Sequence, residues 1–200
     1  MFLITKGDFF LGFYRIFSQN IRKEGEESMG RWVVGWLIGA LFWSGCAVKY
    51  ESFEPTAQEN QKVKTLQKEL LALSPEVDPK EAELIAHEAI TYPKQLANSY
   101  NLISPPLFHN FLVNAGIRDR GLCYQWAEDL GNHLKTFRPQ SLKIRFGVAN
   151  LGENDEHNAV VVIPKGGSFS EGIVLDPWRE SSKLYWIGVG SDPKYRWKER

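Results

Sequence analysis

The segment PQSLKIRFGV, residues 139–148, marks the point where the periodicity of the sequence changes from helical to extended. Apolar side chains occupy every second position from Leu142 to Val148, which is the pattern of a strand that is buried on one face. Three further strand-like runs follow, separated by short turns: residues 158–163, 172–175 and 184–189. The C-terminal third is therefore predicted to form a mostly antiparallel sheet.

The clearest helical pattern upstream of this segment begins at Asp78. Asp78 is a favourable N-cap, Pro79 fits the first helical position, and Glu81 would complete a capping box. Pro93 removes a backbone donor and clashes with the preceding turn. The helix is expected to kink or end there, with residues 94–100 as its continuation after a kink.

Three more helices are predicted, at residues 61–73, 107–115 and 122–137. Ser104 is interpreted as the cap of the second of these, Gly116 as its end, and residues 117–121 as a loop. Because helical patterns come first and strands follow, the fold class is predicted to be α+β, with N-terminal helices packed on the sheet.

The composition narrows the classes of function that the chain can have. Two hundred residues fit one domain with appendages. The 24 basic and 24 acidic residues cancel, so the basic excess typical of nucleic-acid-binding proteins is missing. The histidines and cysteines show no paired ligand spacing, so neither a metal nor a cofactor is expected. Cys46 and Cys123 are the two cysteines, which allow at most one disulfide; separate roles are expected for them.

Residues 32–48, WVVGWLIGALFWSGCAV, form an uncharged apolar run that follows Arg31. A basic start, an apolar stretch and small residues near its end are the features of a secretory signal. Residues 29–47 are therefore interpreted as a signal peptide, a lipoprotein signal or a membrane anchor. Because Met29 stands just before the run, residues 1–28 are either an addition from an upstream start codon or a genuine cytoplasmic extension.

The segment Ser44-Gly45-Cys46 resembles the lipobox of bacterial lipoproteins, although a tryptophan stands where that motif usually has leucine. The resemblance implies that Cys46 is lipidated and becomes the mature N-terminus. An uncleaved anchor helix and ordinary cleavage nearby are the alternatives. All three place the rest of the chain in the periplasm or cell envelope, provided that the N-terminus stays inside. That exported part divides into a tether, residues 48–60, and a domain, residues 61–200.

Three polar residues stand at the ends of predicted elements. Cys123 opens a helix, where the positive helix N-terminus lowers the pKa of a thiol and favours the nucleophilic thiolate. His157 begins a strand, and Asp176 ends the next one. A thiol, a histidine base and a carboxylate that orients the imidazole are the parts of an activated nucleophile.

The segments around these residues, GLCYQWA at 121–127, EHNAV at 156–160 and VLDPW at 174–178, resemble the core of the transglutaminase-like, papain-fold cysteine enzymes. The resemblance implies a papain-like core, with Cys123 as nucleophile, His157 as general base and Asp176 as orienting acid. It covers under a third of the chain. Many relatives have an aromatic residue two positions after the histidine, where this chain has alanine, which puts efficient catalysis in doubt more than the fold.

The remaining site residues are less clearly marked by the sequence. The backbone N–H of Cys123 is the expected oxyanion donor, because a helix N-terminus presents free N–H groups. Asn110 and Gln125 are candidates for a side-chain donor, and Trp178 is a candidate cleft residue. Arg179 is expected to brace a nearby carboxylate or to bind one on the substrate.

The first functional hypothesis is an exported thiol enzyme that transfers acyl groups from an amide, by hydrolysis or transamidation. Its location favours peptide or peptidoglycan amides as substrates. The alternatives are a non-catalytic cell-envelope binding module and a structural lipoprotein, in which Cys123 is a buried packing residue. Peptidoglycan-cleaving thiol hydrolases commonly use a second histidine after the first. None follows His157, so Asp176 fits better as the third member. His109 is expected to be structural or to line the cleft, and His133 to be solvated.

Overall fold

The computed structural model describes residues 45–200, and the predicted extension 1–28 and most of segment 29–47 lie outside this range. Its helices are α3 (Ala57–Ala72), α4 (Pro79–Ser99), α5 (Pro106–Asn114) and α6 (Cys123–Thr136). Its strands are β1 (Cys46–Ala47), β2 (Ile103–Ser104), β3 (Leu142–Ala149), β4 (His157–Pro164), β5 (Ile173–Glu180), β6 (Lys183–Gly188) and β7 (Lys198–Glu199). Two short 3₁₀ turns, η1 (Phe169–Glu171) and η2 (Val189–Ser191), complete the fold. None of the helices in residues 45–200 is both long and apolar enough to cross a bilayer.

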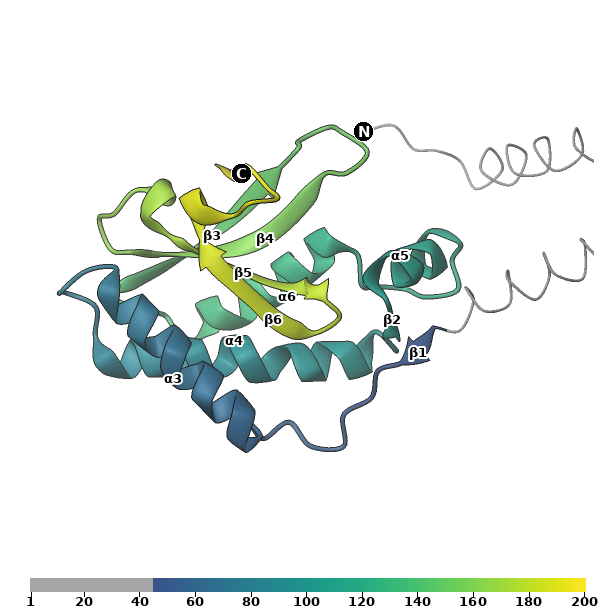
Figure 1. The fold of residues 1–200 in the computed structure, drawn as a ribbon, viewed down its shortest axis with the longest axis horizontal. Coiled ribbons are helices and arrows are strands. Elements are labelled where there is room, and N and C mark those ends of the chain that lie inside the picture. Colours follow the sequence, from purple (N-terminus) through teal and green to yellow (C-terminus); the bar gives the residue numbers. More distant parts are fainter. Residues whose placement is uncertain (1–44) are drawn as a thin grey trace, which may run out of the picture. The chain divides into compact units, whose positions relative to one another are not determined.

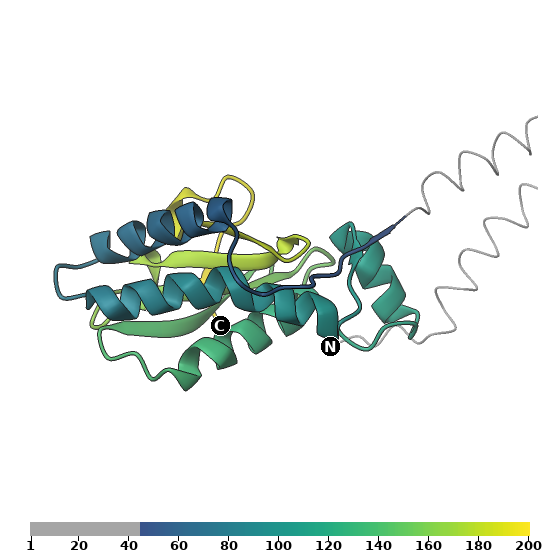
Figure 2. The same ribbon diagram turned by 90° about the horizontal axis from the view of Figure 1, so that it is seen from below.

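The prediction of an α+β domain with a mostly antiparallel sheet is confirmed. The five-stranded sheet has the order β6-β5-β4-β3-β7, and each neighbouring pair is antiparallel. Helices α3, α4 and α6 lie together on one face of this sheet, as Figures 1 and 2 show from two directions. Strand β4 is the central strand; its first residue pairs with β3, and its pairing with β5 covers Val160 to Val162.

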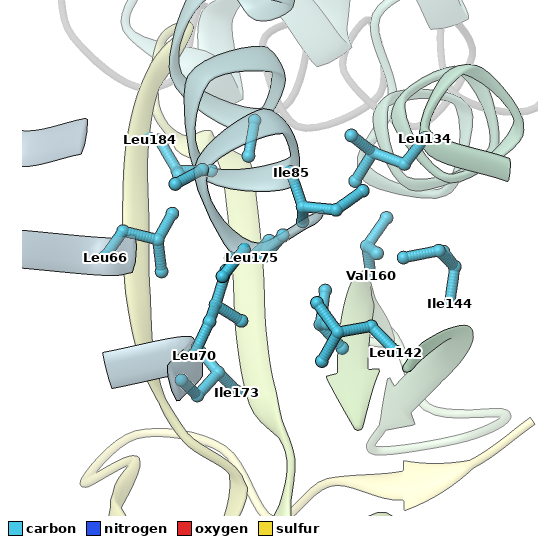
Figure 3. Packing of buried hydrophobic residues seen from close by; sticks show 14 of the residues in the cluster. Leu66, Leu70, Ile85, Leu134, Leu142, Ile144, Val160, Ile173, Leu175 and Leu184 are labelled. Atoms are coloured by element: carbon cyan, nitrogen blue, oxygen red, sulfur yellow. The ribbon is translucent and has the colours of Figure 1, made fainter. Parts of the chain in front are cut away.

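Strand β4 separates two apolar layers. Val160 and Val162 belong to the layer under the helices, while Val161 belongs to the opposite layer with Tyr195 and Trp197 from the C-terminal segment. Figure 3 shows the helix-side layer, where α3, α4 and α6 contribute Leu66, Leu70, Ile85 and Leu134. Because both faces of β4 are buried, its sequence from Ala159 onward is apolar instead of alternating.

The segment predicted as a tether is in part ordered against the domain. Helix α3 begins at Ala57, four residues earlier than predicted, because Thr56 and Glu59 form a capping box. Upstream of it, Asn98 of α4 holds Tyr50 with two hydrogen bonds to its backbone, of 2.9 and 2.7 Å. The buried ammonium group of Lys94 donates to the Glu59 carboxylate at 2.8 Å. The helical domain therefore starts before residue 61.

The start of α4 is as predicted, but the predicted role of Glu81 is wrong. The Asp78 side chain accepts from the backbone N–H groups of Lys80 and Glu81. The Glu81 carboxylate does not return to the N-cap; it accepts from the backbone N–H groups of Gln140 and Ser141, at 2.6 and 2.8 Å. Glu81 thus ties the start of α4 to the start of β3.

Of the two outcomes expected at Pro93, the structure excludes the helix end, and the predicted cap of the next helix is not formed. Helix α4 continues through the buried Pro93 to Ser99, so the helix does not end there. Before α5, the N-cap is Pro105 and no side chain caps the helix, so the predicted capping role of Ser104 is wrong. A Ser104–Pro105 cis peptide bond leads into this helix. Gly116 follows the C-cap Ala115 with a positive φ, as expected for a helix end.

The end of the sheet also differs from the prediction. Strand β5 does not end at Asp176; it continues to Glu180, with an irregularity in its pairing with β6 between these two residues. Strand β7 pairs with β3 at Gly147 and Val148 and was not predicted. Because β7 has only two residues, it is too short to show a periodic pattern.

Candidate functional site

The loop before α6 places Cys123 at the first position of that helix. Leu122 is the N-cap and has extended backbone angles. The side-chain oxygen of Gln125 accepts from the backbone N–H groups of Gly121 and Leu122, at 2.8 and 3.0 Å. Helix geometry gives the N–H of Cys123 no intrahelical acceptor. The thiol therefore lies at the positive end of α6, next to a backbone donor that can face an oxyanion.

Gly121 is required by its surroundings. Its φ is +129°, a value that residues with a side chain rarely adopt. A Cβ atom at this position would lie 2.3 Å from Nε2 of His109. The close approach of this loop to His109 fixes where α6 begins, and so where the thiol lies.

His109 is structural, which is one of the two roles expected for it. The ring is fully buried, and burial lowers the pKa of its imidazole. Its Nδ1 accepts from the backbone N–H of Ile103 at 3.2 Å. Its Nε2 donates to the carbonyl oxygen of Arg120 at 2.9 Å. The neutral ring thereby joins β2, α5 and the loop before Cys123.

The side chains of His157 and Asp176 meet between two neighbouring strands. His157 is the first residue of β4, and Asp176 is in the neighbouring antiparallel strand β5. Nε2 of His157 lies 2.6 Å from Oδ2 of Asp176, and both side chains are almost fully buried. The hydrogen bond occupies Nε2 and leaves Nδ1 as the second ring nitrogen.

The thiol of Cys123 lies beside the backbone just before His157. Its Sγ lies 3.7 Å from the carbonyl oxygen of Glu156, the residue before His157. Burial lowers the pKa of His157, but the interactions with the Asp176 and Cys123 side chains raise it more, to about 9. The structure thus pairs His157 with Asp176 and places the Cys123 thiol beside the residue that precedes His157, and the imidazole is stabilised in its protonated form.

Aromatic rings surround the imidazole of His157. Their centroids lie 4.8 Å away for Trp178, 4.6 Å for Tyr195 and 5.5 Å for Trp197. Trp178 comes from β5, and the other two come from the C-terminal segment. These rings exclude water, so charges in the site interact more strongly than they would in solvent.

A buried ion pair lies behind Asp176. Nε of Arg179 lies 3.0 Å from Oδ2 of Asp176, and Nη2 of Arg179 lies 2.8 Å from Oδ2 of Asp192. Burial raises the pKa of Asp192. Its hydrogen bonds, above all with Arg179, lower the pKa by more than burial raises it, so the net value is about 2. Of the two roles considered for Arg179, the structure shows the brace between carboxylates. His157, Asp176, Arg179 and Asp192 form one chain of alternating acceptors and donors.

Asp192 was not identified from the sequence. Its carboxylate is fully buried and also accepts from the backbone N–H of Lys194 at 2.9 Å and from the Trp197 indole at 3.0 Å. The available signal was a second Asp-Pro pair, Asp192-Pro193, like Asp176-Pro177. That signal alone indicates only a turn.

The three candidate oxyanion or cleft residues have different positions. Gln125 is a helix cap, because its side-chain oxygen is occupied by two backbone N–H groups before Cys123. Asn110 accepts from the Trp178 indole at 3.1 Å, which joins α5 to the aromatic wall around His157. The Asn110 oxygen is thus occupied, and Trp178 is a wall of the site.

The other predicted polar residues lie outside this cluster. Cys46 is exposed, and both cysteines are free in the described part of the chain. His133 is not simply solvated: its Nε2 lies 2.7 Å from the Glu88 carboxylate, and its ring stacks on Tyr92. Within residues 45–200, no group of histidine, cysteine or carboxylate side chains is arranged to hold a metal ion.

Two surface pockets lie away from the thiol. One is near the start of α4 and is lined by Asp78, Ser141 and their neighbours. The other lies between α3 and α4, with Val63 and Leu84 in its lining. Neither of them includes Cys123.

Comparison with known proteins gave no match to a family model, a curated protein or a solved structure.

Proposed function

We propose that this chain is an exported, membrane-anchored thiol enzyme with a transglutaminase-like core, which transfers the acyl group of an amide to water or to an amine. The observation that carries the proposal is the position of His157. Its ring forms a 2.6 Å hydrogen bond with Asp176, and the Cys123 thiol lies 3.7 Å from the carbonyl oxygen of Glu156, the residue before His157. A nucleophile, a proton carrier and an orienting acid in this order are the parts of an acyl-transfer site.

The raised pKa of His157 suits the ring as the proton carrier of this mechanism. Its hydrogen bond with Asp176 favours the protonated ring, and its pKa is raised to about 9. In the proposed reaction, the proton that leaves Cys123 passes to His157, which gives a thiolate beside an imidazolium as the attacking pair. The chain from Asp176 to Arg179 keeps that carboxylate in place beside the imidazolium.

The acylation step follows from this pair. The thiolate of Cys123 attacks the carbonyl carbon of the amide, and the carbonyl oxygen becomes an oxyanion near the N–H of Cys123 at the N-terminus of α6. The intermediate collapses as the C–N bond breaks, and His157 gives its proton to the leaving amine. The products of this step are a thioester on Cys123, a neutral amine and a neutral imidazole.

The second step regenerates the site. Neutral His157 removes a proton from water or from an acceptor amine, which attacks the thioester. The C–S bond breaks, and the thiolate and imidazolium are restored as the acid or the new amide leaves. Peptide or peptidoglycan amides are the proposed substrates, because the proposed location in the cell envelope exposes the site to them.

Alkylation kinetics test this proposal on the full chain. Iodoacetamide is expected to modify Cys123 at about pH 6, well below the pKa of an ordinary cysteine near 8.5. The variant H157Q should lose this reactivity, and C123S should show none at this position by peptide mass analysis. Equal rates for Cys123 and for free glutathione at about pH 6, or unchanged rates in H157Q, would overturn the proposal.

A further inference from the structure

Helix α5 has two faces of opposite character. Its inner face holds the buried His109 and Asn110, which accepts from Trp178 in the wall of the site. Its outer face exposes 72% of Leu107 and 42% of Phe111, which are four residues apart and so share one side of the helix. Ile117, in the loop after α5, is 57% exposed. We call these three residues, Leu107, Phe111 and Ile117, the α5 face.

The α5 face lies at the end of the domain where the described chain begins. The backbone N–H of Val48 donates to the carbonyl oxygen of Leu102 at 2.8 Å. Strand β2 follows at residues 103–104, and α5 begins at Pro106. Figures 1 and 2 both show α5 at this end, beside β1 and β2.

The length of chain between the proposed lipidation site and the domain is short. Cys46 and Val48 are two residues apart, and two extended residues span only about 7 Å. Both residues belong to the apolar run 32–48, which contains no charged residue and is followed by Lys49. A lipid or an anchor at this point therefore holds the neighbouring end of the domain close to the bilayer.

The charges around the α5 face suit a phospholipid surface. Lys49 is exposed, and it follows Val48, whose backbone N–H bonds to Leu102. The Arg118 guanidinium group bonds to the backbone oxygens of Asn101 and Ile117, and it forms no ion pair within residues 45–200. Arg120, in the same loop, is paired with Asp129 and Glu128, so Lys49 and Arg118 are the basic groups available to a phospholipid. Apolar side chains flanked by basic ones are typical of surfaces that lie in the membrane interface.

We propose that the α5 face docks on the bilayer that holds the N-terminal anchor, with Leu107, Phe111 and Ile117 in the interface. The inference rests on the anchored location in the proposed function. Because the inner side of α5 contacts the wall of the Cys123 site, this docking holds the site beside the membrane surface. Its substrates are then amides that lie close to the bilayer.

Photo-crosslinking on the full chain in phosphatidylglycerol-containing membranes tests the docking. Benzoylphenylalanine is placed at Leu107, and a matched control is placed at Phe137, which is 38% exposed at the far end of α6. We expect lipid adducts at position 107, at least ten times as abundant as at position 137. A double variant, L107D/F111D with the probe at position 117, is expected to lose the adducts.

Three outcomes would overturn the docking: adducts equal at the two positions, adducts to a protein instead of lipid at position 107, or a chain that does not sediment with membranes. Iodoacetamide reactivity of Cys123 in the same samples separates this inference from the proposed function. Lipid adducts with an unreactive thiol would leave the docking standing and refute the enzyme. A reactive thiol without lipid adducts would leave the enzyme proposal standing and refute the docking.

Discussion

Nε2 of His157 lies 2.6 Å from Oδ2 of Asp176, and the two side chains are 2% and 1% exposed. The bond joins the first residue of β4 to the fourth residue of β5, so the pairing of two central strands fixes its geometry. Because the bond uses Nε2, the ring presents Nδ1 as its second proton-carrying atom. The chemistry proposed for Cys123 depends on this arrangement.

Replacing the carboxylate of Asp176 by an amide tests its effect on the imidazole. In D176N, the bond that most favours the protonated ring is weakened, so the pKa of His157 should fall from about 9 by about one pH unit or more. Titration of the His157 ring by NMR measures this change. An unchanged pKa would show that Asp176 does not stabilise the imidazolium.

Removal of Arg179 should be costly for stability. R179M would leave the buried carboxylates of Asp176 and Asp192 without their shared cation, and loss of one partner of a buried ion pair costs about 3–5 kcal/mol. The matched control is R145M, because the Arg145–Glu199 pair is about half exposed and such pairs contribute about 0–1 kcal/mol. Urea unfolding of both variants gives the two free energies. Equal losses would contradict the structural role of Arg179.

The loop before the thiol should not tolerate a side chain at Gly121. In G121A, a methyl group would overlap the buried ring of His109, and the positive φ adds strain of about 1–3 kcal/mol. G152A is the control: its φ is also positive, at +81°, but nothing lies within 4 Å of the added methyl group. We expect thermal unfolding to show a larger loss for G121A. If the two variants melt alike, the contact with His109 does not constrain the loop.

The histidine should also make stability depend on pH. Burial lowers the pKa of His157, but its bonds with Asp176 and Cys123 raise it to about 9, against 6.5 for an unperturbed histidine. Between these values the folded chain keeps a proton that the unfolded chain releases, so the free energy of unfolding falls as pH rises. The contribution is fully present below pH 6.5 and lost above about pH 9.

The expected loss across this window is on the order of 1–3 kcal/mol. Urea unfolding at several pH values measures it. The same series on H157Q should lack this component of the slope, because no imidazole remains to hold the proton. Identical slopes for the two chains would mean that His157 does not carry the raised pKa.

The positions of the site residues could be predicted because element boundaries are visible in the sequence. Cys123 follows a glycine-containing loop and begins an apolar helical pattern, and His157 begins a β-branched run. Both are the first residues of α6 and β4. Neighbouring antiparallel strands then bring Asp176 to His157, so the order of the strands was enough to predict this pair.

The support behind the site could not be predicted in the same way. The Arg179–Asp192 pair depends on how the C-terminal segment folds back over the sheet, which periodicity does not encode. Gln125 was considered as an oxyanion donor, but it caps the helix, because a glutamine at the third helical position reaches back to the backbone N–H groups before it. Glu81 likewise bonds to distant backbone groups in preference to its own N-cap.

The central claim is that His157, held by Asp176, takes the proton from Cys123 when the thiol acts as a nucleophile. The most direct test is a crystal structure of the chain, which measures the distance from Sγ of Cys123 to Nδ1 of His157. We expect a distance of about 3–4 Å, with Asp176 bonded to the other ring nitrogen. An imidazole that faces away from the sulfur would contradict the account.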